Sequence, residues 1–168
     1  RRAEYPLIPL EYFRRRNFAF PIGVQVFINF AYMGGFILTP LLLQNVLGYG
    51  ETRTGLISIA RPLAFAIAGP LAGYVTVRTG ERASAMTGAV LVGASMVGMA
   101  AVGGGTSDLM IMAALALAGV GAGAALPATA ATIANSVAER DLGVVGAAQQ
   151  MTTEVGLLAG IQIMQTVQ

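Results

Sequence analysis

Residues 147–160, with the sequence AAQQMTTEVGLLAG, place one carboxylate, that of Glu154, in an otherwise apolar and small-residue segment. A charge at the centre of about 20 apolar residues lies near the membrane midplane, where the low dielectric favours the neutral, protonated form. Such a carboxylate can take up and release a proton if its surroundings open alternately to either side. Gln150 lies one helical turn earlier on the same face. Glu154 and Gln150 are therefore candidates for contact with a proton or a substrate.

Two other roles for Glu154 remain open from the sequence. Gln150 or a neighbouring helix could hydrogen-bond the carboxylate and fix the packing. The carboxylate could also bind a cationic substrate without changing its protonation state. Gly156 and Gly160 lie on the opposite side of the same helix, where small residues allow another helix to approach closely.

A second polar arc lies in the first apolar segment of the chain. Gln25, Asn29, Tyr32 and Thr39 follow one another at helical spacing and share one face. Polar groups on a membrane helix avoid acyl chains, so this face meets either a watery cavity or another helix. We take Gln25, Asn29 and Tyr32 as cavity candidates and keep structural hydrogen bonding as the alternative.

Arg61 is the only other charged residue that the pattern places inside an apolar segment, and it is followed by Pro62. A long cationic side chain near the end of a membrane helix commonly extends outward to water. Alternatively, Arg61 turns inward and holds an anionic group or a carboxylate from another helix. Both interpretations remain open, and Arg61 is kept among the candidate binding residues.

The residue inventory excludes several kinds of chemistry. The chain contains no His and no Cys, so imidazole relays, disulfides and thiolate metal sites are absent from it. Hydrolase and phosphate-binding motifs are also missing, and we expect no enzyme activity, no metal site and no bound cofactor. A net charge of +2 is too small and too scattered for nucleic-acid binding.

The apolar residues form runs long enough to cross a bilayer. The composition is 55% hydrophobic and 11% charged, whereas soluble domains average about 25% charged residues. Alternation with period two, which would indicate a membrane barrel, is not seen. The pattern predicts an all-α membrane protein with five spans, near 18–46, 54–77, 84–104, 109–136 and 143–167.

The arginines predict the orientation of these spans. Eight of the ten lie before the first span or in the loops after the second and fourth spans, and this Arg-rich side is expected to be cytoplasmic. Residues 1–17 then form a cytoplasmic or interfacial lead-in. We expect an integral protein of the plasma membrane, with residue 1 in the cytosol. Five crossings leave the chain on the far side, which suggests a piece of a longer protein.

Four segments carry a family resemblance. They are PLIPLEYFRRRNFA (6–19), TPLLLQNVLGYGETRTGL (39–56), GPLAGYVTVRTGER (69–82) and the long stretch from Gly121 to Met164. Together they resemble the major facilitator superfamily, and more narrowly the C-terminal half of its fourteen-helix drug:proton antiporters of the EmrB/QacA type. Glu154 stands where that branch usually has an uncharged residue.

The third of these segments resembles the conserved loop motif of the superfamily. Gly73, Arg78, Gly80 and Arg82 occupy matching positions, while Val77 replaces the usual Asp. In the family this loop pairs charges across the two halves of the protein. The resemblance therefore implies a conformational role for the loop, and simple anchoring by positive charge on the cytoplasmic side is the alternative.

The resemblance implies five of the six helices of a C-terminal bundle, with the third span facing lipid and the other four lining the cavity or the interdomain faces. It further implies alternating access against a missing N-terminal bundle, driven by a proton gradient, with export of hydrophobic or amphiphilic small molecules across the bilayer. An exporter of lipids or metabolites, or a non-transporting membrane scaffold with the same helices, is the alternative.

Overall fold

A computed structural model describes residues 16–166 of the chain, including most of their side chains; the side chains of residues 17, 140, 160, 161 and 163–166 lie outside the described set. Most of the lead-in expected at 1–17, and the Arg140 side chain, therefore lie outside the described residues. The elements, in chain order, are α1 (Arg16–Leu41), the π-helix η2 (Leu42–Val46), α2 (Glu51–Ser58), α3 (Ala60–Thr79), α4 (Glu81–Ala100), α5 (Asp108–Asn135), the 3₁₀-helix η3 (Glu139–Asp141) and α6 (Leu142–Thr166).

The all-α fold class predicted from the sequence is confirmed. Within the described residues, four helical segments are long and apolar enough to cross a membrane: Phe18–Val46, Glu51–Thr79, Glu81–Ala100 and Asp108–Asn135. Each begins and ends within a few residues of an expected span. The fifth expected span, 143–167, coincides with α6, a helix of 25 residues.

Prolines explain two irregularities in the helices. The second span is interrupted at Ile59, between α2 and α3. Pro62 follows three residues later, and its ring nitrogen cannot donate a hydrogen bond to the carbonyl of Ser58. In the same way, Pro40 precedes the point where α1 changes into the π-helix η2. By contrast, α3 and α5 continue through Pro70 and Pro127 without a break.

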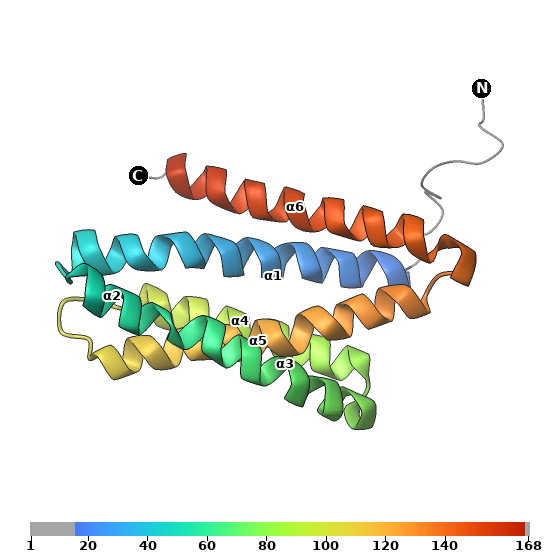
Figure 1. The fold of residues 1–168 in the computed structure, drawn as a ribbon, viewed down its shortest axis with the longest axis horizontal. Helices are drawn as coiled ribbons and strands as arrows, with labels where there is room; N and C mark the ends of the chain where they lie inside the picture. Colours follow the sequence, from blue (N-terminus) through green and yellow to red (C-terminus); the bar gives the residue numbers. More distant parts are fainter. Residues whose placement is uncertain (1–15, 167–168) are drawn as a thin grey trace.

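The helices form two groups that meet along α1 and α5. In Figure 1, α6 lies beside α1 and runs in the same direction, while α3, α4 and α5 lie on the other side of α1. Helix α5 packs against both α3 and α4 along most of its length, whereas α3 and α4 contact each other much less. Helix α6 contacts mainly α1 and therefore forms an edge of the bundle.

Close approach of α5 to its two neighbours depends on glycine. A Cβ at Gly119 would overlap the carbonyl oxygen of Arg61 on α3, and a Cβ at Gly88 would overlap that of Gly121. In a membrane, where lipid offers no hydrophobic drive, such close backbone contact supplies much of the packing attraction. The pair Gly69 and Gly73 has the same spacing, but a Cβ at either position would meet open space.

Three apolar clusters are distributed along the length of the bundle. The first joins the start of α1 to the end of α5 and the start of α6 through Phe18, Ile133 and Val145. The second centres on Ile28 and Val92, and the third, at the far end, contains Leu43, Ile57 and Ile111. The first two clusters tie α1 to other helices, and the third ties its continuation η2 to them, which fixes the level of the polar residues of α1 relative to the other helices. The buried polar groups of α1 lie between these clusters.

Candidate functional site

The polar arc of α1 meets α6 at Gln25. The side chain of Gln25 is buried, its Nε2 donates to Thr153 Oγ1 at 3.1 Å, and its Oε1 accepts from Gln149 Nε2 at 2.9 Å. Close by, Gly156 packs against the backbone of Val26. The packing surface expected at Gly156 is thus observed, and Gln25 is held within the same seam between α1 and α6.

Asn29 and Thr39 are buried and bond to their own helix. Asn29 Nδ2 donates to the carbonyl oxygen of Gln25 at 2.9 Å, and Thr39 Oγ1 donates to that of Gly35 at 2.5 Å. Bonds of this kind satisfy a polar group without a partner helix. The polar arc of α1 therefore makes the structural hydrogen bonds that the sequence left as one of two alternatives. These bonds hold the side chains of Asn29 and Thr39 at fixed positions along α1.

Glu154 and Gln150 lie on a different face of α6 from the seam. Both side chains are exposed, and Gln150 Nε2 donates to Glu154 Oε1 at 2.8 Å. Helix α6 is an edge helix, so this face is not covered by another described helix. An ion pair joins Arg53 to Asp108, whereas Glu154 has no cationic partner among the described residues. This exposed face of α6 therefore carries the carboxylate of Glu154 and the amide of Gln150 next to each other.

Arg61 turns inward and is one of the most buried side chains, with 2% of its surface exposed. It crosses from α3 to α1, where Nη1 donates to the carbonyl oxygen of Tyr32 at 3.2 Å and Nη2 to Thr39 Oγ1 at 3.4 Å. Its guanidinium carbon lies 5.6 Å from the centre of the Tyr32 ring, within reach of a cation–π contact. The outward alternative considered for this residue is not what the structure shows.

Gly35 supplies the space for the Arg61 guanidinium. A Cβ at Gly35 would lie 3.0 Å from both terminal nitrogens of Arg61, closer than ordinary contact. Despite this enclosure, Arg61 Nε has no hydrogen-bond partner among the described residues. Tyr32 also contacts Phe65 of α3, with ring centres 5.8 Å apart. These side chains bridge α1 and α3 in a region where the two helix backbones are not in contact.

Arg61 and Glu154 lie beside different levels of α1. Gln25 marks the level of Thr153, the residue before Glu154, whereas Gly35 marks the level of the Arg61 guanidinium. Ten residues of helix separate these levels, or about 15 Å. The structure therefore brings Gln25 close to α6 and Tyr32 close to Arg61, and it does not bring Arg61 to Glu154.

The loop motif forms the turn between α3 and α4. Gly80 has φ +88°, a conformation that side-chain-bearing residues rarely adopt, and it ends one helix and begins the next. Arg78 Nη2 donates to the Tyr74 hydroxyl at 2.7 Å, and Arg82 is exposed. Beside the turn, Asn135 Nδ2 at the end of α5 donates to Glu81 Oε1 at 2.7 Å. Gly73 lies next to Tyr74, and a Cβ at Gly73 would meet open space.

Sequence reasoning missed several residues that complete these contacts. Gln149 and Thr153 were not singled out, although they lie one turn apart and hold Gln25. Their spacing was a signal, because it is the same four-residue spacing that marked Gln25 and Asn29. The described residues contain no group of three or more acidic side chains that could hold a metal ion.

The fold and these sites define a helical membrane protein whose spans carry a polar seam, a buried arginine and an uncovered carboxylate. The sequence matches the Major Facilitator Superfamily over residues 1–163, which is nearly the whole chain. The chain belongs to this superfamily, as the resemblance indicated.

The names of several similar proteins refer to drug transport, resistance or export. The chain is 22% identical to the multidrug transporter protein MdtP of Bacillus subtilis, over 99% of this chain and 31% of that protein. It is 27% identical to the tetracenomycin C resistance and export protein of Streptomyces glaucescens, over 97% of this chain and 30% of that protein. It is also 36% identical to the multidrug resistance protein Stp of Mycobacterium tuberculosis, over 52% of this chain and 16% of that protein.

These 168 residues therefore span less than a third of the length of the first two of these relatives. No solved structure matches the chain.

Proposed function

We propose that the chain is part of a secondary transporter that exports hydrophobic or amphiphilic compounds by alternating access, driven by the proton gradient. The observation that carries this proposal is the match to the Major Facilitator Superfamily over residues 1–163, together with relatives whose names refer to drug or antibiotic resistance and export. The plasma membrane, with residue 1 on the cytoplasmic side, is the location that the arginine distribution supports.

The position of Glu154 supports a role in coupling. A carboxylate that faced acyl chains would be costly at this depth, since insertion scales give about 2.5–3.5 kcal/mol for a charged residue at the centre of a span. The described helices leave this face of α6 uncovered and supply no cation to Glu154. A water-filled cavity between two bundles would solvate the carboxylate and allow it to exchange a proton. Gln150, which already donates to it, would hold its orientation.

The remaining candidates divide into two roles under this proposal. Gln25 sets the register between α1 and α6, Asn29 bonds to the Gln25 carbonyl within α1, and Tyr32 and Arg61 tie α1 to α3. Cavity substrates would then contact the exposed side of α6, while the seam keeps α1 and α6 moving as one unit. The motif residues Gly73, Arg78, Gly80 and Arg82 would act at the cytoplasmic side, where the missing N-terminal bundle offers partners.

The test uses the protein expressed from its full gene in a host that lacks its own efflux pumps. Accumulation of a cationic fluorescent dye should fall when the protein is present and recover when a protonophore collapses the gradient. Glu154→Gln should keep expression but abolish or reshape the pH dependence of export. Glu139→Gln, which removes a carboxylate from the exposed loop, is the matched control and should leave export unchanged.

Two results would count against the proposal. Dye accumulation that is unaffected by the wild-type protein, with the same result for several other amphiphiles, would remove the export function. Export by Glu154→Gln that matches the wild type from roughly pH 5 to pH 9 would remove the coupling role of this carboxylate while leaving export in place.

A further inference from the structure

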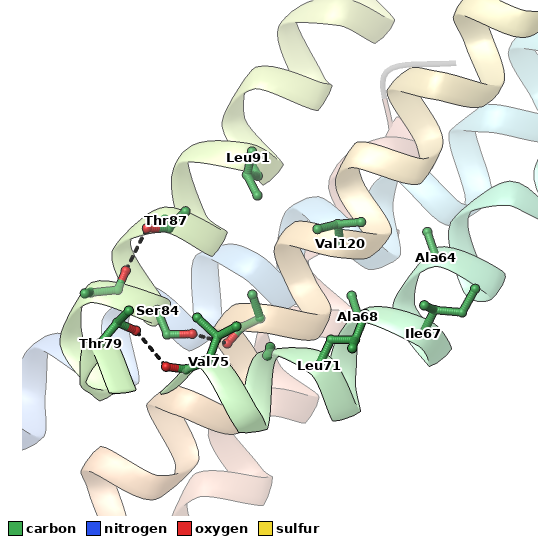
Figure 2. Close-up of a pocket in the computed structure, with 13 residues that line it drawn as sticks. Ala64, Ile67, Ala68, Leu71, Val75, Thr79, Ser84, Thr87, Leu91 and Val120 are labelled. Atoms are coloured by element: carbon green, nitrogen blue, oxygen red, sulfur yellow. Dashed lines mark hydrogen bonds between the residues drawn. The ribbon is translucent and has the colours of Figure 1, made fainter. Parts of the chain in front are cut away.

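A groove of about 590 Å³ runs along the outside of the bundle between α3 and α4. Figure 2 shows its walls, formed by Ile67, Leu71 and Val75 on α3 and by Leu91 and Thr87 on α4, with Val120 of α5 between them. The groove exists because both α3 and α4 pack tightly on α5 but diverge from each other away from their shared turn at Gly80. Its volume lies within the range of ligand pockets, about 300–1,000 Å³.

The groove is suited to an apolar occupant. Its few hydroxyl groups are already satisfied internally: Thr79 donates to the Val75 carbonyl oxygen at 3.1 Å and Thr87 to that of Ala83 at 2.8 Å. Ser84 likewise donates to the carbonyl oxygen of Ala124 at 3.3 Å. Water in the groove would find few polar partners, whereas an alkyl chain would fill it at little cost.

The surroundings of the groove indicate that its occupant comes from the bilayer. Large apolar side chains on both rims point outward, with exposures of 56% for Ile67, 61% for Leu71 and 69% for Val90. A charge within the lining would indicate a protein neighbour or water, and the lining contains neither Arg nor an acidic residue. In a membrane, this face therefore meets acyl chains.

A cation lies at the end of the groove where α3 turns into α4. Arg78 is next to the lining residue Thr79 and one turn after the lining residue Val75, which places it on the rim. Its guanidinium rests 4.9 Å from the centre of the Tyr74 ring and donates to the Tyr74 hydroxyl, which steadies the side chain at this position. An arginine next to an apolar groove at the membrane surface complements a phosphate above an alkyl chain.

We propose that the groove between α3 and α4 binds one acyl chain of an anionic phospholipid, whose headgroup phosphate is held by Arg78. The site lies on α3 and α4, which do not contact α6, and it uses none of the side chains near Glu154. It shares Arg78 with the loop motif of the proposed function. The lipid would fill the space where α3 and α4 diverge and so brace these helices against α5.

Native mass spectrometry of the protein expressed from its full gene can count bound lipids. The probes are phosphatidylglycerol and phosphatidylcholine with identical acyl chains, each titrated into the detergent-solubilised protein. Wild type should bind phosphatidylglycerol more tightly. Arg78→Gln should lower this preference about five-fold, the effect expected of one basic residue near an anionic surface at about 1 kcal/mol. Arg82→Gln removes the same charge from the same turn. Although its neighbour Ala83 lines the groove, Arg82 lies on the opposite side of α4 from the lining residues Thr87 and Leu91, and its replacement should change the preference much less.

A second variant tests the groove independently of charge. Val120→Phe narrows the floor and should reduce binding of both lipids while leaving their ratio unchanged. Val97→Phe adds the same ring to an exposed position of α4 beyond the last lining residue, Leu91, and should leave both affinities unchanged.

Several outcomes would overturn the proposal. One is equal binding of the two lipids by wild type, and another is full binding by a monodisperse Val120→Phe protein. Equal losses of preference in Arg78→Gln and Arg82→Gln would assign the effect to general surface charge instead of this site. None of these readouts involves transport, so they are independent of whether the protein exports drugs.

Discussion

Arg61→Met should stabilise the protein, although it deletes two hydrogen bonds. The guanidinium is 2% exposed, and its contacts are one carbonyl oxygen at 3.2 Å, one hydroxyl at 3.4 Å and the ring of Tyr32. None of these groups carries a negative charge, and Nε has no partner among the described residues. The positive charge is therefore buried without compensation within the part of the chain that the structure describes.

Arg61→Met changes the free energy of unfolding through contributions of opposite sign. Loss of a hydrogen bond from a charged donor to the Tyr32 carbonyl costs about 1.5–3 kcal/mol. Burial of an ion costs several kcal/mol even after relaxation, and the unsatisfied Nε adds about 1–3 kcal/mol. Met has a similar length, fills the space beside Gly35 and removes both penalties. Replacement of a buried ion pair by apolar groups is neutral to stabilising by about 1–4 kcal/mol, and a gain in this range is expected here because Arg61 lacks a charged partner among the described residues.

The assay is reversible unfolding of the protein from its full gene in mixed micelles, followed as the denaturing detergent is increased. Arg61→Ala is the matched comparison, because it removes the same charge but leaves a cavity and should be less stable than Arg61→Met. Arg53→Met controls for charge removal at an exposed site and should change stability little.

The reasoning would be refuted by a loss of stability of about 3–5 kcal/mol in Arg61→Met. Removal of one member of a buried ion pair causes a loss of that size. It would mean that a carboxylate or another anion from outside the described residues reaches Arg61. Arg61 would then hold the anionic group or carboxylate that the sequence analysis considered as its partner, and this binding would explain why its side chain points inward.

Two further predictions concern packing and are measured in the same unfolding assay. Gly119→Ala should destabilise the protein by about 1–3 kcal/mol because its Cβ meets the backbone of α3. Gly93→Ala, in a helix with open space around that position, should stabilise the protein by up to about 1 kcal/mol, and the same sign for both variants would contradict the assigned contacts. Gln25→Leu should cost about 1 kcal/mol, and a double-mutant cycle with Thr153→Val should give a coupling of about 0.6–1.7 kcal/mol; a coupling of zero would remove the bond between α1 and α6.

The positions of the helices could be predicted from hydropathy because membrane spans must satisfy their backbone internally. The break at Ile59 could not, since several prolines lie within the spans and only Pro40 and Pro62 accompany an irregular turn. Whether a proline interrupts a helix depends on neighbouring side chains and backbone groups, which the sequence alone does not place. Likewise, the spacing of Gly69 and Gly73 equals that of Gly119 and Gly123, yet only at the second pair would a Cβ meet another helix.

The surroundings of Arg61 and Glu154 could not be predicted from helical periodicity. Helical spacing assigns Arg61 and Glu154 each to one side of its own helix, but which neighbour lies on that side depends on contacts between distant segments. Once α6 is placed at the edge of the bundle, Glu154 faces outward, and α3 turns Arg61 towards Tyr32. Arg61 therefore donates to a carbonyl oxygen and a hydroxyl of α1, while Glu154 accepts from Gln150 among the described residues. A charged residue at the centre of a span that faces acyl chains costs about 2.5–3.5 kcal/mol, and this cost is the physical basis of the coupling role proposed for Glu154 on the uncovered face of α6.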